Sequence, residues 1–160
     1  EEIDSTRVKK TEKKVKLPKQ ISALLQAFMA DTFIQAIDFA DSLVLYGDHL
    51  YEAPSGLPSL DKCKVAQPGR YLGEFRKGRF HPSHAWAMSL HPTNVKRIQA
   101  YQSSNPELYR FLQGETVPTT HSGWTLVTVD GYPLGWGKGA GGILKNHYPK
   151  WLRFIYDSII

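Results

Sequence analysis

The chain has 160 residues, 41% of them hydrophobic, and a net charge of +5 at pH 7, which is enough to bury one ordinary core. No apolar run reaches the length of a membrane span, the start lacks the apolar stretch of a signal peptide, and one cysteine excludes an internal disulfide. We therefore expect a cytoplasmic, monomeric globular protein without a metal. The missing initiator methionine predicts a fragment of a longer protein.

Charge is distributed unevenly along the chain. Residues 21–61 contain six acidic residues and no Lys or Arg, whereas residues 62–160 contain thirteen basic and five acidic residues. A positive surplus in the C-terminal part favours a polyanionic partner, and nucleic acid is the commonest one in the cytoplasm. A solvated surface explains the same charge equally well.

The first third of the chain predicts a linker, a helix and several strands. Residues 1–19 are rich in Lys, Glu and Thr, as linkers are. Apolar residues at helical spacing from Ile21 to Phe28 predict an amphipathic helix. A hairpin is expected around Gly47-Asp48. Further expected features are strands at residues 65–66 and 71–75, a turn at Pro68-Gly69 and a break at Gly78.

Three short helices are expected in the middle of the chain. Pro82 can open the first of them, and Ser83 is expected to act as its cap. The second is expected over residues 93–101. The third has Asn105 as its cap, a proline at its first position and Gly114 as its stop.

The last third returns to strands. Apolar and threonine residues alternate over residues 124–129, Asp130-Gly131 predicts a hairpin turn, and Pro133 in the returning strand indicates an edge strand or a bulge. The glycines of residues 135–142 fit a sharply bent small barrel or a backbone that a ligand approaches. The predicted class is α+β, with mainly antiparallel sheets.

Residues 135–153 combine the groups that single-stranded RNA needs. Four cations can bind phosphates, planar side chains can stack on bases, and Asn146 can read a base edge. The cations are Lys138, Lys145, Lys150 and Arg153, and the planar side chains are Trp136, His147, Tyr148 and Trp151. Each single aromatic is more readily explained as a core residue.

Other chemistry is weakly supported. His81, His84 and His91 lack a carboxylate or thiolate grouped with them, so a zinc site is not expected. Ser83 and His84 are adjacent and would point apart on a helix, so they do not predict a nucleophile and its base, and His84 is expected in packing or an RNA contact. Cys63 is expected as a small apolar residue.

Three segments carry a resemblance to a known family. They are residues 70–85 (RYLGEFRKGRFHPSHA), residues 130–138 (DGYPLGWGK) and residues 145–150 (KNHYPK), of which the last is the most specific. Over roughly residues 40–153 the chain resembles the C-terminal region of RsmF-type ribosomal RNA methyltransferases, the bacterial Sun-like branch of cytosine-5 methyltransferases.

The resemblance implies a domain organisation. In that family an N-terminal domain binds S-adenosylmethionine and attacks cytosine with a cysteine, and a small subdomain and a PUA-like RNA-binding barrel follow. The cofactor loop and the Pro-Cys motif of that domain are absent here, so the resemblance implies a non-catalytic fragment without its own cofactor. It implies a linker in residues 1–19, an α+β subdomain in 20–91, connecting helices in 92–115 and a PUA-like antiparallel barrel in 116–160.

The resulting hypothesis is a fragment that holds ribosomal RNA for its own N-terminal catalytic domain, as part of rRNA processing in ribosome biogenesis. The expected RNA contacts are Lys138, Lys145, Asn146, His147, Lys150 and Arg153, with Arg76, Lys77, Arg79 and His84 as a second set. The alternative is a structural domain that braces the catalytic domain or touches ribosomal protein, which the acidic residues 21–61 favour.

Overall fold

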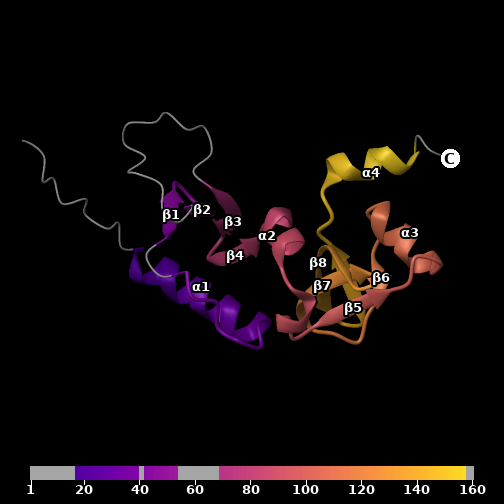
Figure 1. The fold of residues 1–160 in the computed structure, drawn as a ribbon, viewed down its shortest axis with the longest axis horizontal. Helices are drawn as coiled ribbons and strands as arrows, with labels where there is room; N and C mark the ends of the chain where they lie inside the picture. Colours follow the sequence, from indigo (N-terminus) through magenta and orange to yellow (C-terminus); the bar gives the residue numbers. More distant parts are fainter. Residues whose placement is uncertain (1–16, 40–41, 54–68, 158–160) are drawn as a thin grey trace, which may run out of the picture.

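A computed structural model describes residues 17–39, 42–53 and 69–157. Residues 1–16 of the linker expected over 1–19, the strand at 65–66, Pro68 and Cys63 lie outside the described residues, and the end of that linker, Lys19, is the first residue of a helix. Two halves lie side by side along the long axis (Figure 1). No described helix has the length and apolar character needed to cross a membrane.

The first half consists of a helix, a four-stranded sheet and a short second helix. Its elements are α1 (Lys19–Thr32), β1 (Leu43–Tyr46), β2 (His49–Glu52), β3 (Arg70–Arg76), β4 (Arg79–Pro82) and α2 (His84–Ser89). The strands form an antiparallel meander in the order β1-β2-β3-β4. The predicted helix and the hairpin at Gly47-Asp48 are confirmed.

One face of this sheet packs against α1 and α2. Leu50, Leu72 and Phe80 are buried in one cluster with Phe28 of α1 and Trp86 of α2. Burying each such side chain contributes roughly 1.5–3 kcal/mol, so this cluster holds the half together.

A β-bulge in β3 determines which side chains face away from α1. Leu50 pairs with Gly73 and Tyr51 pairs with Tyr71, so Leu72 is an extra residue between two ladder positions. A Cβ at Gly73 would lie 2.3 Å from the carbonyl oxygen of His81. The bulge therefore requires glycine, and it lets Leu50 and Leu72 face the core while both tyrosines face outward.

Helix α2 begins later than the sequence indicates. Pro82 was expected in its first turn, but it is the last residue of β4 and pairs with Gly73. Ser83 is the cap, as expected, because its Oγ accepts a hydrogen bond from the backbone N–H of Trp86 at 3.0 Å. A serine hydroxyl can satisfy an N–H at the helix start, which a proline cannot.

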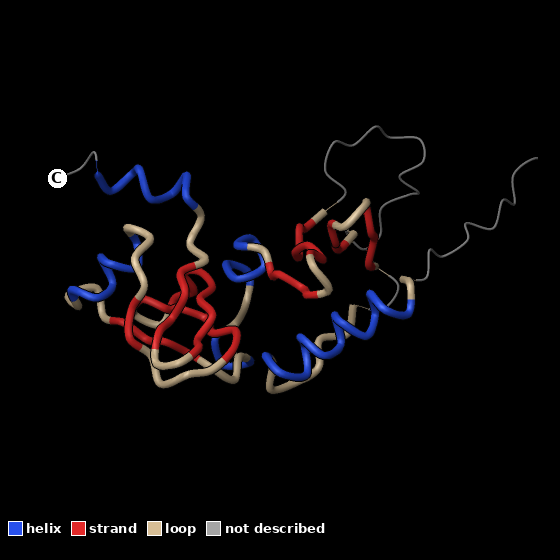
Figure 2. Tube along the Cα trace, turned by 180° about the vertical axis from the view of Figure 1, so that it is seen from behind, coloured by secondary structure: helices blue, strands red, loops and turns tan. Residues whose placement is uncertain are grey.

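The second half is a five-stranded sheet with a 3-10 helix and two further α-helices. Its elements are the 3-10 helix η2 (Pro92–Asn94), β5 (Ile98–Tyr101), α3 (Pro106–Leu112), β6 (Val117–Pro118), β7 (Gly123–Val129), β8 (Tyr132–Ala140), β9 (Ile143–Asn146) and α4 (Lys150–Asp157). Seen from behind, the strands of the two sheets form separate groups with α2 between them (Figure 2).

The prediction of a helix over residues 93–101 is wrong. Only Pro92–Asn94 is helical there, and Ile98–Tyr101 is β5, which pairs in parallel with β7. Tertiary contacts override the local pattern, because the backbone N–H and C=O groups of β5 form ladder hydrogen bonds with β7. The side chain of Arg97, just before β5, also bonds to Asp31 of α1. Residues 92–115 therefore supply a strand to the second sheet as well as α3.

The second sheet is curled. Its order is β5-β7-β8-β9-β6, antiparallel except for β5 with β7. The edge strands approach each other, since Gln99 of β5 donates to the Pro118 carbonyl and accepts from Thr119. Pro133 pairs with Thr128 next to a register shift, so of the two predicted explanations, an edge strand or a bulge, the structure shows the bulge. The α+β class is confirmed.

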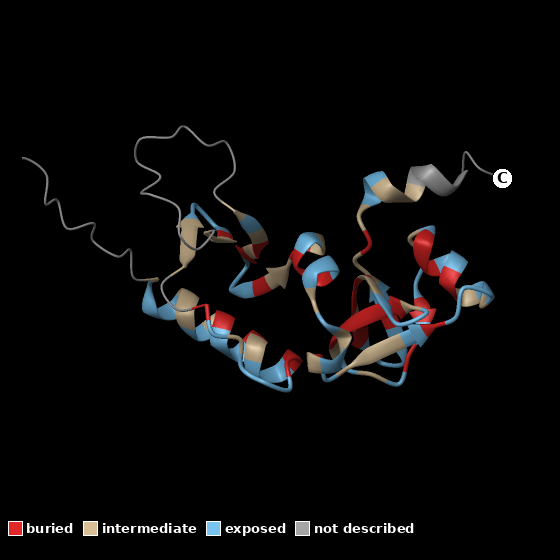
Figure 3. Ribbon diagram, viewed as in Figure 1, coloured by how far each residue is buried: buried red, intermediate tan, exposed pale blue. Residues whose placement is uncertain are grey.

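A single core cluster joins the two halves. Trp124, Leu126 and Trp136 of the second sheet are buried together with Phe28 and Trp86 of the first half. The buried stretches of β7 and β8 are visible as red ribbon in Figure 3. The opposite face of the second sheet packs on α3 through a separate cluster. The junction between the halves is therefore a packed and defined surface.

Candidate nucleic-acid interface

A group of basic and aromatic side chains lies at the junction. Trp124 pairs with Lys138 and Lys138 pairs with Lys145, so all three occupy one face of the sheet formed by β7, β8 and β9. The Nζ atom of Lys138 lies 5.3 Å from the Trp124 ring centroid. The His147 ring, just after β9, lies 4.6 Å from Trp124 between ring centroids.

The first half contributes to the same group. His81 of β4 places its ring 6.2 Å from that of Trp124. Arg76 at the end of β3 acts electrostatically on both His81 and His147. We call these residues the basic junction: Arg76, His81, Trp124, Lys138, Lys145 and His147.

The environment of His147 reflects this concentration of charge. Burial lowers its pKa first, and the positive charges of Lys145, His81, Lys138 and Arg76 lower it further, to about 4. Its buried Nε2 has no hydrogen-bond partner among the described residues. His147 is therefore a neutral ring at neutral pH, surrounded by cations.

Few acidic groups offset these cations. Glu74 of β3 pairs with Arg76 at 3.6 Å and also acts on His81. Lys138 and Lys145 form no ion pair with any described residue. The basic junction thus keeps a positive surplus that can attract an anion.

The hairpin tip beside the junction carries the other predicted cations of the first half. Lys77 and Gly78 form its turn, with φ angles of 51° and 70°. Arg76 and Arg79 are directly opposite each other in the ladder and both are exposed. Like charges at opposite positions destabilise a hairpin, so this arrangement is better suited to binding than to stability.

Two of the predicted contacts, Asn146 and Arg153, make hydrogen bonds within the chain. The Asn146 amide donates to the carbonyls of Phe111 and Glu115, and its Oδ1 accepts from the N–H of Tyr148. Arg153 donates twice to the Tyr148 carbonyl, at 3.1 and 2.8 Å. The geometry corrects the expectation of a base-reading Asn146, because both amide hydrogens are already used.

His84 and Lys150 also lie apart from the basic junction. The His84 ring packs 5.7 Å from that of Tyr148, and burial lowers its pKa. It has the packing role that was one of its two expected roles. Lys150 is exposed at the start of α4 and is not among the charges that act on His147.

The glycines of β8 allow the sheet to bend, because other parts of the chain approach them closely. A Cβ at Gly137 would meet the Leu144 side chain at 2.6 Å, and one at Gly139 would meet the His121 carbonyl oxygen at 2.2 Å. The space beside these glycines is therefore filled by protein, which supports the bent-barrel interpretation and leaves no room for a ligand. Trp136 and Tyr148 are buried, whereas Trp151 is 68% exposed.

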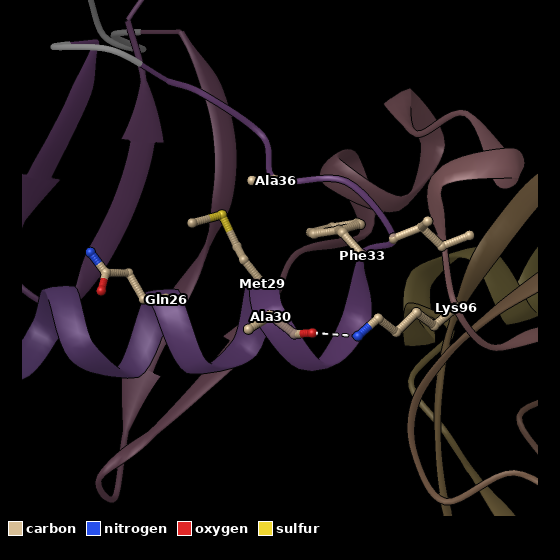
Figure 4. A pocket seen from close by; sticks show the side chains of 7 residues that line it. Gln26, Met29, Ala30, Phe33, Ala36 and Lys96 are labelled. Carbon is tan, nitrogen blue, oxygen red and sulfur yellow. Dashed lines mark hydrogen bonds between the residues drawn. The ribbon is translucent and has the colours of Figure 1, made fainter.

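An apolar pocket lies elsewhere, where the C-terminal part of α1 meets the segment before β5 (Figure 4). Its lining residues are Gln26, Met29, Ala30, Phe33, Ile34, Ala36 and Lys96. The only charged side chain there, Lys96, donates to the Ala30 carbonyl at 2.7 Å. Within the described ranges, no three potential ligands gather into a metal site. The pocket therefore offers apolar contact and no catalytic group.

Sequence reasoning missed two members of the basic junction, Trp124 and His81. The alternation over residues 124–129 and the turn at Asp130-Gly131 would have placed Trp124 beside Lys138 if the hairpin register had been counted. His81 has no such signal, because the packing of the two halves brings it to Trp124.

Two family models match the chain, one for each half. Residues 27–90 match the first C-terminal domain of the RsmF rRNA methyltransferase, and residues 99–154 match the methyltransferase RsmF PUA domain. The second match begins within β5 and ends within α4. The curled sheet is accordingly a PUA-like fold, and the chain is a C-terminal region of an RsmF-type rRNA methyltransferase.

Proposed function

We propose that this chain binds ribosomal RNA and holds it for a catalytic domain elsewhere in the protein, which methylates a cytosine at C5. The observation that carries the proposal is the basic junction, where Arg76, Lys138 and Lys145 surround the neutral ring of His147. Phosphates supply most of the affinity of RNA-binding proteins, and Lys138 and Lys145, which form no ion pair with a described residue, are the cations most available to them.

The glycines of β8 do not form a loop for S-adenosylmethionine. A cofactor loop needs glycines that leave backbone open to the ligand at the start of a helix. Gly137 and Gly139 instead lie within a strand of an antiparallel sheet and face protein atoms. We therefore assign cofactor binding and methyl transfer to the catalytic domain, and RNA binding to this chain.

Charge reversal tests the proposal. We expect Lys138→Glu with Lys145→Glu to weaken binding of a labelled rRNA fragment at least tenfold. The slope of log affinity against log salt should fall by about 1.5, because each lost phosphate contact removes roughly 0.7–0.9 from it. Fluorescence anisotropy between low and moderate salt measures both quantities.

A matched control reverses two cations away from the junction. Lys19 starts α1, and Arg110 is exposed on α3, which packs on the opposite face of the second sheet. Lys19→Glu with Arg110→Glu changes the net charge equally and should leave the salt slope almost unchanged. Equal losses in the two double variants, or wild-type binding that is indifferent to salt, would refute the proposal.

The second candidate is a domain that braces the catalytic domain. The apolar pocket at α1 favours it, since its lining residue Ile34 is 61% exposed and residues 21–61, which supply every lining residue except Lys96, contain no Lys or Arg. This candidate predicts little RNA affinity for the chain alone and no dependence of it on Lys138 and Lys145. The same titration therefore separates the two functions.

A further inference from the structure

Four planar side chains form a ladder across the outer face of the first sheet. The Tyr46 and Tyr51 rings lie 5.9 Å apart, those of Tyr51 and Tyr71 lie 5.1 Å apart, and the His49 ring lies 5.6 Å from that of Tyr71. His49 Nδ1 and the Tyr71 hydroxyl are 2.7 Å apart and form a hydrogen bond. We call Tyr46, His49, Tyr51 and Tyr71 the aromatic ladder.

The ladder faces away from the core. Leu50 and Leu72 face α1 and α2, and the bulge at Leu72 directs Tyr51 and Tyr71 to the opposite side. Tyr46 is 52% exposed, His49 is exposed, and Tyr51 and Tyr71 are partly exposed. Aromatic residues on the sheet face that points away from the core contribute little to that core, and exposed clusters of this kind are typical of surfaces that contact another molecule.

The ladder is continuous with the basic junction. His49 pairs with Glu74, and Glu74 pairs with His81, which contacts Trp124. Glu74 is neutralised by Arg76, and Arg79 lies opposite Arg76 on the same face. The charged side chains between the ladder and Lys138 are therefore predominantly basic.

We propose that the aromatic ladder is a stacking platform for unpaired RNA bases, whose phosphates are held at the basic junction. The inference rests on the proposed function and adds a second site, on the outer face of the first sheet, that binds bases through stacking and not through charge. Aromatic rings accept any base because every base has a planar face, and strand spacing allows successive bases to reach successive rings. The surplus of cations favours RNA over an acidic protein as the occupant.

The test separates bases from phosphates. An oligoribonucleotide of eight uridines is compared with one of eight abasic ribose phosphates, which has the same charge. We expect the complete 160-residue chain to bind the uridine octamer roughly tenfold or more tightly, because each stacked base adds at least about fivefold to the affinity. Tyr46→Ala with Tyr51→Ala should abolish this preference and leave the salt slope unchanged.

Three controls accompany the double variant. Tyr46→Phe with Tyr51→Phe keeps the rings and should keep the preference for bases. Tyr132→Ala removes a tyrosine that is 74% exposed at another hairpin and should change nothing. Tyr46→Ala alone provides a milder variant whose fold is checked by circular dichroism.

Each outcome bears on a different claim. If wild-type chain binds both octamers equally, or if the alanine variants keep the preference for uridine, the ladder does not stack bases and serves a protein contact instead. If neither octamer nor the rRNA fragment binds, the proposed function itself fails. Lys138→Glu with Lys145→Glu should weaken both octamers equally, which distinguishes the two sites.

Discussion

His147 shows how one residue can report on the whole basic junction. Its ring contacts Trp124, and burial, together with cations from both halves, lowers its pKa to about 4. The unfolded chain keeps the ordinary value of 6.5, so it binds more protons than the folded chain between these two values. The contribution of a neutral His147 to the stability of the folded chain is therefore fully present above about pH 6.5, and it is lost as the pH falls toward 4.

We predict that His147→Asn removes part of this acid sensitivity. Between pH 7 and pH 4.5 the wild-type chain should lose about 2 kcal/mol more unfolding free energy than the variant, after allowance for solvent screening. Urea unfolding at several pH values measures it. His91→Gln, a change at an exposed histidine before η2, is the control. A difference that does not change with pH would contradict the account of His147.

Asn146 illustrates the limit of reading roles from residue type. Asparagine in a basic and aromatic segment is a reasonable base reader, and the sequence offers no sign that its amide is used elsewhere. Its partners, Phe111 and Glu115, lie more than thirty residues away along the chain. Only the packing of α3 beside β9 shows that the side chain fastens the two together.

At the scale of elements, the glycines of β8 are the clearest constraint. Gly139 faces the backbone carbonyl of His121, whereas the space beside Gly142 in the following turn is open. We predict that Gly139→Ala lowers the free energy of unfolding by about 3 kcal/mol through overpacking. Gly142→Ala should cost only about 1 kcal/mol, for its positive φ of 83°.

Urea unfolding of the two glycine variants gives both values. The comparison is matched, because each change adds one methyl group to the same hairpin. Equal costs would show that the close approach of β8 to the His121 backbone does not constrain the sheet. Overpacking at Gly139 should be felt strongly because a backbone oxygen, unlike a side-chain end, cannot move aside cheaply.

Elements with local signals were predictable, and those made by distant pairing were not. Helix α1 followed from its apolar spacing, and the hairpins followed from Gly47-Asp48 and Asp130-Gly131. Strand β5 was predicted as a helix because its ladder partner among the described strands is β7, whose paired residues lie 28 positions later in the chain, as Ile98 and Leu126 do. The aromatic ladder escaped prediction because the bulge at Leu72 sets the register that aligns Tyr71 with Tyr51.

At the scale of the whole molecule, the two matched domains share one surface. Buried side chains from α1, α2, β7 and β8 form a continuous cluster, and the Trp136 indole N–H donates to the Ser83 carbonyl at 3.0 Å. Arg97 and Asp31 add an ion pair of 2.7 Å between the halves. These contacts hold Arg76 of the first domain beside the lysines of the second, so RNA bound there should contact both domains.

The most direct test of this shared surface compares single cations by their effect on the salt dependence of RNA binding. Arg76→Ala in the first domain and Lys145→Ala in the second should each lower the slope by roughly 0.7–0.9, whereas Arg110→Ala on α3 should leave it unchanged. If Arg76→Ala behaves like Arg110→Ala while Lys145→Ala lowers the slope, the second domain binds RNA alone and the shared surface is contradicted.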